Sequence, residues 1–128
     1  GAHNIETRVI EDNKVIKRLH EKADRLLIDS PCSGLGVLKR NPDSKWKIDQ
    51  DFIDRIKKEQ QQILQDYSKI IRKGGKLVYA TCSILPSENN EQVAEFLKNN
   101  PDFKLVKDEK VMPSSGFDGF YMALIERI

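Results

Sequence analysis

The sequence predicts an α/β protein with parallel strands. Two apolar runs carry this prediction, because each ends in a polar loop: residues 26–28 lead into DSPCSG (29–34), and residues 77–80 lead into TCS (81–83). Each is typical of a buried strand followed by a tight loop. An amphipathic helix between them completes a βαβ unit, in which the strands are parallel. Both loops would then lie at the carboxyl edge of the sheet, where ligands bind in such folds.

The composition fits one folded domain. The 128 residues are 38% hydrophobic and 33% charged, with a net charge of +2, which alone is too small to indicate a polyanionic partner. No apolar run approaches the roughly 20 residues that span a bilayer. Two cysteines do not form a disulfide framework, so a cytoplasmic location is expected. Residues 1–3 resemble a tag remnant, which leaves 4–128 as the domain.

Two strands and a helical turn are expected in the first part of the chain. Residues Asn4–Glu11 alternate partly and contain β-branched side chains, which predicts a strand that ends at Asp12. Residues 14–19 have helical spacing, and Arg25–Asp29 is the first buried strand.

A long basic loop follows, from Ser33 to Lys47. Loops of this length in compact domains are typically functional or disordered. Around a single tryptophan, Trp46, the loop carries the basic residues Lys39, Arg40, Lys45 and Lys47. This mixture, from Lys39 to Lys47, suits a polyanion, and the tryptophan could stack on a base. The alternative is a solvated loop with Trp46 as a core anchor, and a lone tryptophan favours that alternative because it is usually buried.

The remaining elements complete the predicted sheet and its helices. Asp49 or Asp51 would cap a helix running to about Arg72, with Gly74-Gly75 at its C-cap. Ser87 would cap a second helix, 88–99, whose acidic first turn suits the helix dipole. Its expected inner face comprises Val93, Ala94, Phe96 and Leu97. Strands are expected at 76–81, 103–107 and 120–126, with a loop at 113–116.

The two cysteines suggest covalent chemistry. If the two buried strands are neighbours, their ends lie about 4.8 Å apart, so Cys32 and Cys82 face one cleft with Asp29 between them. A thiolate that adds to a cytosine ring makes carbon C5 nucleophilic toward a methyl group, and a carboxyl group can stabilise the developing charge. A second group must then help to remove the C5 proton and release the thiol.

Simpler interpretations stay open. A single cysteine after a strand is more often a small buried hydrophobic residue than a nucleophile. Two cysteines at equivalent strand ends make the catalytic and the structural interpretations about equally good. A redox pair is possible, although no Cys-x-x-Cys is present. No metal is expected, because two thiols and two histidines lack ligand spacing. Asp29 could be a turn residue.

Three blocks resemble the Sun (Fmu) family of RNA cytosine-C5 methyltransferases, which use S-adenosylmethionine. They are DSPCSGLGVLKRNPDSKW (29–46), TCS followed by PSEN (81–83 and 86–89), and DGFY (118–121). They occur in the family's order and span nearly the whole chain.

The resemblance implies roles for individual residues. Cys82 would be the nucleophile that adds to cytosine C6, and Cys32 would assist product release. Asp29 would contact the cytosine and lie near the cofactor, and Asp12 matches an acid near the cofactor's adenine. The residues expected beside the RNA, with ribosomal RNA as the expected partner, are Lys39, Arg40 and Lys45.

The chain also departs from the family pattern. The family's Gly-rich cofactor loop precedes the first residue here, and no strand-Gly-x-Gly-helix pattern exists. The resemblance therefore implies a partial Rossmann-like methyltransferase sheet, mostly parallel with an antiparallel C-terminal strand, that lacks the family's first two strands. We expect the strand at 4–11 either to fray or to pair beside Arg25–Asp29, because an unpaired parallel edge is unfavourable. We also expect the isolated chain to bind cofactor weakly or not at all.

Two other functions remain alternatives at this point. A DNA cytosine methyltransferase would use Cys32 of the Pro-Cys pair as nucleophile and leave residues 81–83 unexplained. A non-catalytic RNA-binding module would keep the fold without the reaction.

Overall fold

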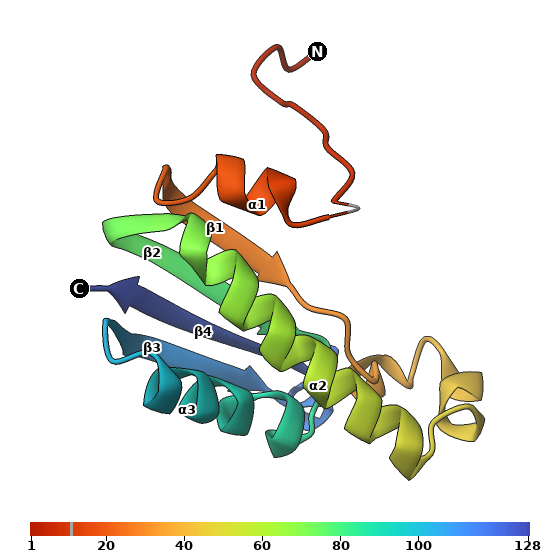
Figure 1. The fold of residues 1–128 in the computed structure, drawn as a ribbon. Helices are drawn as coiled ribbons and strands as arrows, with labels where there is room; N and C mark the ends of the chain where they lie inside the picture. The colour runs from red at the N-terminus through yellow and green to blue at the C-terminus, as the bar shows by residue number, and fades with distance from the viewer. Residues whose placement is uncertain (11) are drawn as a thin grey trace.

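The computed structural model describes residues 1–10 and 12–128, and its centre is one four-stranded sheet (Figure 1). The strand order is β1-β2-β4-β3, and the strands are β1 (Ala23–Asp29), β2 (Ile71–Thr81), β3 (Phe103–Val111) and β4 (Phe120–Arg127). β1 and β2 are parallel, whereas β4 is antiparallel to both β2 and β3. Three strands therefore share one direction and only the C-terminal strand is reversed, which confirms the predicted fold class.

One face of the sheet is covered by helices. α2 (Gln50–Tyr67) and α3 (Asn90–Asn99) lie across it, and the short α1 (Lys14–Arg18) lies beside β1 (Figure 1). The alternation in β2 shows this directly, because Leu77 and Tyr79 are fully buried while Val78 between them is half-buried. On the edge strand β1, Leu27 is paired with Val78 and is 68% exposed. The core thus lies between the sheet and α2 and α3.

The predicted first strand is wrong over residues 4–10. These residues form no strand, and the side chains of Ile5 and Val9 are 72% and 78% exposed. Glu11, the last residue of that prediction, lies outside the described residues. β1 is at the end of the sheet order, so residues 4–10 do not pair beside it, and of the two expected outcomes the segment takes the unpaired one. An alternating pattern forms a strand only where a neighbouring strand pairs with it, and no described strand pairs with this segment.

The long helix begins where predicted but ends earlier. Asp49 caps α2, since its carboxylate accepts a hydrogen bond from the amide of Phe52 at 2.8 Å. The helix ends at Tyr67, and Gly74 and Gly75 lie inside β2 instead of capping it. The pairing with β1 shifts there, and Gly74 has a φ of +76°, which favours glycine. The glycines therefore form a bulge in a strand, not a helix terminus.

The start of the last helix also differs from the prediction. Ser87 does not cap it, because a 3₁₀ turn at Pro86–Glu88 comes first and α3 begins at Asn90. Val93 and Phe96 are buried as expected, whereas Ala94 is exposed and Gln92 is buried in its place. The inner face is rotated relative to the prediction, and Glu88 lies in the 3₁₀ turn before the helix, where its side chain is buried.

The loop between β1 and α2 lies beyond the carboxyl ends of β1 and β2 (Figure 1). It contains two short 3₁₀ segments, Leu35–Val37 and Pro42–Trp46. In the part of the chain that the structure describes, no helix has the length and apolar composition needed to cross a membrane.

Candidate functional site

The two cysteines meet at the carboxyl edge of the parallel pair. The sulfur atoms of Cys32 and Cys82 are 3.3 Å apart, and both residues are half-buried. The strands before them are in register, with Asp29 opposite Ala80. The amide of Ser30 extends this pairing by donating to the carbonyl of Ala80 at 2.9 Å. The predicted convergence of the two thiols is thereby confirmed, while their chemical roles stay predictions.

A buried carboxylate ties the two cysteine loops together. Glu88 is fully buried, and its Oε1 accepts hydrogen bonds from the amide of Ser33 at 2.8 Å and from Nε2 of Gln60 at 3.2 Å. Its Oε2 accepts from the hydroxyls of Ser33, at 2.6 Å, and Ser83. The sequence prediction missed this role and assigned Glu88 to the helix dipole. The signal available was the serine that follows each cysteine.

Two glycines let the three sequence blocks approach one another. The amide of Gly36 donates to the carbonyl of Cys82 at 2.9 Å, and the amide of Gly119 donates to the carbonyl of Gly36 at 2.7 Å. A Cβ on Gly36 would lie 2.1 Å from the oxygen of Gly119 and 2.7 Å from that of Cys82. Only glycine fits there. The blocks at 29–46, 81–83 and 118–121 are therefore adjacent in space.

The environment of Cys32 favours the neutral thiol. Burial, followed by the hydrogen bond with Cys82, raises the pKa of the Cys32 thiol from its ordinary value of 9.0 to about 12. At neutral pH, Cys32 is consequently a neutral thiol and not a thiolate, and either sulfur can donate in the contact between the two.

The two aspartates of the prediction lie in different places. Asp29 ends β1 and is exposed, and its carboxylate has no hydrogen bond or ion pair with any described residue. Asp12 accepts a hydrogen bond from the amide of Lys14 at 2.8 Å and pairs with its ammonium at 3.1 Å. Asp12 therefore serves the start of α1, and it lines a groove of about 220 Å³ against α2 that neither cysteine lines.

The basic part of the loop, from Lys39 to Lys47, is largely exposed. Trp46 is 80% exposed, and the ammonium of Lys45 lies 4.8 Å from the centre of its ring. The prediction that Trp46 anchors the core is therefore wrong, because the loop extends past the sheet and has no core beneath it. Arg40 is paired with Asp118 at 2.7 Å, and Lys39 is exposed.

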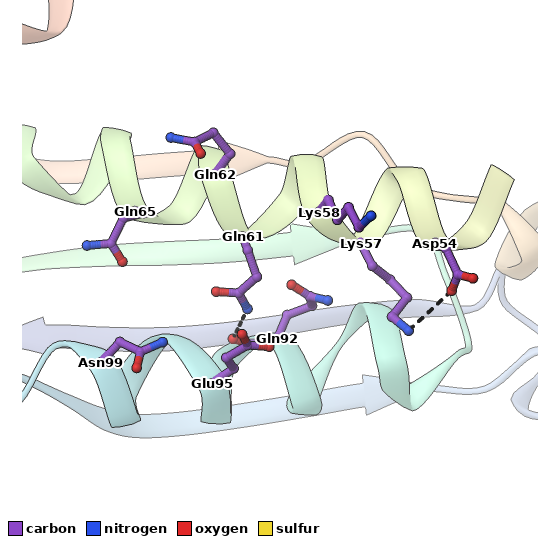
Figure 2. Close-up of a pocket in the computed structure, with 9 residues that line it drawn as sticks. All are labelled: Asp54, Lys57, Lys58, Gln61, Gln62, Gln65, Gln92, Glu95 and Asn99. Carbon is purple, nitrogen blue, oxygen red and sulfur yellow. Dashed lines mark hydrogen bonds and ion pairs between the residues drawn. The ribbon is translucent and has the colours of Figure 1, made fainter. Parts of the chain in front are cut away.

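A separate polar groove of about 550 Å³ lies between α2 and α3 (Figure 2). Gln61 crosses it, donating to the carbonyl of Gln92 at 2.7 Å. Neither cysteine lines it, so this groove is distinct from the cysteine site. Over residues 1–10 and 12–128, no group of three or more His, Cys, Asp or Glu residues is arranged to hold a metal ion.

Curated relatives match most of the chain. The ribosomal RNA small subunit methyltransferase B of Vibrio cholerae serotype O1 is 41% identical over 114 residues, which covers 84% of this chain and 26% of that protein. The protein of the same name from Proteus mirabilis is 43% identical over 106 residues, covering 81% of this chain and 25% of its own length. The chain thus spans about a quarter of the length of these relatives.

Solved structures show the same fold. The crystal structure of NSun6 from Pyrococcus horikoshii with SFG has a TM-score of 0.78 and 26% identity, covering 93% of this chain and 34% of that one. A methyltransferase homologue protein from Pyrococcus horikoshii has a TM-score of 0.73 and 24% identity, covering 88% and 42%. The family model described as 16S rRNA methyltransferase RsmB/F matches residues 3–125, and this chain belongs to that family.

Proposed function

We propose that this chain supplies the cysteine site of a cytoplasmic methyltransferase that transfers a methyl group from S-adenosylmethionine to C5 of a cytosine in ribosomal RNA. In this proposal, residues 4–128 are the C-terminal portion of a Rossmann-like catalytic domain. The single observation that carries the proposal is the 3.3 Å separation of two sulfurs from different loops at one sheet edge. The RsmB/F family membership supplies the substrate class.

Cys82 is the nucleophile in the proposed reaction. Its sulfur adds to C6 of the cytosine, which makes C5 electron-rich and able to accept a methyl group. The C5 proton then passes to a water molecule, the electrons of the C5–H bond re-form the ring double bond, and the C6–S bond breaks so that Cys82 leaves as a thiolate. The target base must leave its stack to reach the sulfur.

Cys32 acts on Cys82 in this scheme. Its raised pKa keeps the proton on Cys32 at neutral pH, so Cys32 can donate a hydrogen bond to the Cys82 sulfur and a proton during release. The same property argues against Cys32 as the attacking thiolate, which is what a DNA cytosine methyltransferase of the Pro-Cys type would need.

The described residues fit the cofactor in part. S-adenosylmethionine would supply the electrophilic methyl group. The carboxylate of Asp29 is free to accept hydrogen bonds at the strand end, from the cytosine or the cofactor. Asp12 fits less well, since its carboxylate is engaged by Lys14. A relative in structure was crystallised with SFG, an analogue of S-adenosylmethionine, which supports the cofactor class.

The basic loop supplies the RNA contact in this proposal. Lys39, Arg40 and Lys45 neutralise phosphates, and the exposed ring of Trp46 stacks on a base. Arg40 must leave its exposed pairing with Asp118 to do so, which costs little because such pairs contribute about 0–1 kcal/mol.

Trapping with RNA that contains 5-fluorocytosine tests the proposal. Because the activity is proposed for a protein of the relatives' length, the assay uses the full-length gene product with S-adenosylmethionine. Fluorine at C5 blocks the last step, so a covalent adduct should accumulate on the wild type and on Cys32→Ala, and be absent from Cys82→Ala.

The other outcomes separate the alternatives. An adduct that survives Cys82→Ala would assign the attack to Cys32. RNA binding without an adduct or methyl transfer would favour a non-catalytic module.

A further inference from the structure

We propose that Glu88 is a positioning residue that sets the distance between the two cysteine sulfurs. Its carboxylate forms no hydrogen bond with either sulfur among the described residues, and it binds instead the residue that follows each cysteine. Ser33 follows Cys32 and Ser83 follows Cys82, and both hydroxyls donate to the same oxygen, Oε2. One carboxylate therefore joins two loops that are 50 residues apart in sequence.

The carboxylate is itself held in place. Gln60 of α2 donates to Oε1, and the amide of Ser33 donates to the same atom. The backbone beside it is anchored as well, since the hydroxyl of Tyr79 donates to the carbonyl of Glu88 at 2.8 Å. Contacts with β2 and α2 therefore fix the position of Glu88, and Glu88 in turn fixes the two cysteine loops relative to the sheet.

The two oxygens of Glu88 are the common acceptors of this cluster. Its partners at Ser33, Ser83 and Gln60 act as donors, and a carboxylate accepts without donating. Glu88 has no ion pair with a described residue, so its burial costs free energy that an apolar side chain would avoid. Stabilisation of the fold therefore explains this cluster poorly, whereas fixing the relative position of the two cysteine loops explains it well.

The first test measures sulfur proximity without any substrate. Oxidised glutathione converts the Cys32 and Cys82 thiols to a disulfide, and the two electrons and two protons they lose yield two reduced glutathiones. Glu88→Gln keeps the size of the side chain but replaces an accepting edge with a donating one. We expect it to form the disulfide about tenfold more slowly than the wild type, as misalignment costing about 1.4 kcal/mol would give.

The matched control is Gln92→Leu. Gln92 is also buried, on α3, and its amide nitrogen donates to the carbonyl of Ser87, so it holds the loop after Cys82 without a hydrogen bond to Ser33, Ser83 or the Glu88 carboxylate. We expect this variant to lose stability and keep the wild-type oxidation rate. Loss of a neighbouring negative charge in Glu88→Gln would favour thiolates and speed oxidation, so a slower rate reports separation of the sulfurs.

The result has one threshold. Disulfide formation in Glu88→Gln at least about fivefold slower than in Gln92→Leu supports the proposal, and a smaller difference overturns it. If Glu88→Gln does not fold, Ser33→Ala and Ser83→Ala decide in its place, because each removes one hydroxyl from Oε2. Their oxidation must be slower than that of the control, or the proposal fails.

The catalytic consequence rests on the proposed function and is measured separately. In the full-length gene product, Glu88→Gln should lower the rate of adduct formation with 5-fluorocytosine RNA while leaving the RNA concentration for half-saturation unchanged. Absence of an adduct on the wild type would reject the proposed function, yet the oxidation test of Glu88 would stand. An adduct rate at the wild-type level in Glu88→Gln would reject the positioning role.

Discussion

Gly36 and Gly119 meet backbone to backbone, with the amide of Gly119 2.7 Å from the carbonyl oxygen of Gly36. The amide of Gly36 in turn donates to the carbonyl of Cys82. The position of Cys82 therefore depends on a contact between the loop that carries Cys32 and the loop that leads into β4. Any side chain at either glycine would push on the corner that holds the thiol.

Gly36→Ala should cost about 1–3 kcal/mol of unfolding free energy, because its Cβ would meet two backbone oxygens that cannot yield easily. Urea denaturation followed by circular dichroism measures this. Gly74→Ala is the comparison, since its Cβ meets no atom within 4 Å and reports only the cost of a positive φ, about 1–2 kcal/mol. A smaller loss for Gly36→Ala than for Gly74→Ala would contradict the close approach.

Cys32 should resist alkylation at pH 7–9. Burial and the contact with Cys82 raise its pKa from 9.0 to about 12, so the native state keeps a proton that the unfolded chain would release. The resulting stabilisation is complete below pH 9 and is lost as pH rises toward 12. Iodoacetamide labelling with peptide mapping measures the rate. Labelling of Cys32 at pH 8 as fast as in the urea-unfolded chain would refute the shift.

Trp46→Ala should leave the unfolding free energy within about 0.5 kcal/mol of the wild type, because the ring is 80% exposed. RNA affinity of the full-length gene product should fall by about 5- to 100-fold, as expected for one lost base stack. Filter binding at fixed salt measures it. Ile5→Ala removes a side chain of similar exposure outside the loop and should bind as the wild type does. Equal affinity in both variants would remove Trp46 from the RNA contact.

Arg127→Met should destabilise the chain by about 1–3 kcal/mol. The guanidinium donates to the carbonyl of Ile71 at 2.7 Å and pairs with Glu21 and Asp102, and the side chain is only 19% exposed. Thermal unfolding measures the loss. Arg8→Met removes an exposed pair with Glu6 and should cost less than about 0.5 kcal/mol. A similar loss of stability in the two variants would show that the contacts of Arg127 with Ile71, Glu21 and Asp102 do not stabilise the fold.

The sequence predicted the elements whose signals are local. The apolar runs of β1 and β2 depend on neighbours in the chain and were correct, and Asp49 is the one of the two predicted caps, Asp49 or Asp51, that caps α2. The thiols could be placed together for the same reason, since parallel neighbours share an edge.

The failures came from signals that depend on distant partners. A Gly-Gly pair suits a helix C-cap or a strand bulge, and the pairing of β2 with β1 decided for the bulge. Residues 4–10 alternate like a strand but have no strand beside them. Glu88 suits a helix N-terminus, and only the fold brings Ser33 and Ser83 to it. Trp46 is exposed because its loop is exposed, although tryptophan side chains are usually buried.

The place of β1 at the end of the sheet bears on how this chain behaves in concentrated solution. On one side of this edge strand the backbone amides and carbonyls have no partner strand, so an extended peptide can pair with them. The apolar side chain of Leu27 on the same strand is 68% exposed. Stored at high concentration, the chain should therefore gather into oligomers that light scattering detects. Leu27→Lys should slow this oligomerisation, because it places a positive charge on the edge strand with which further chains would pair.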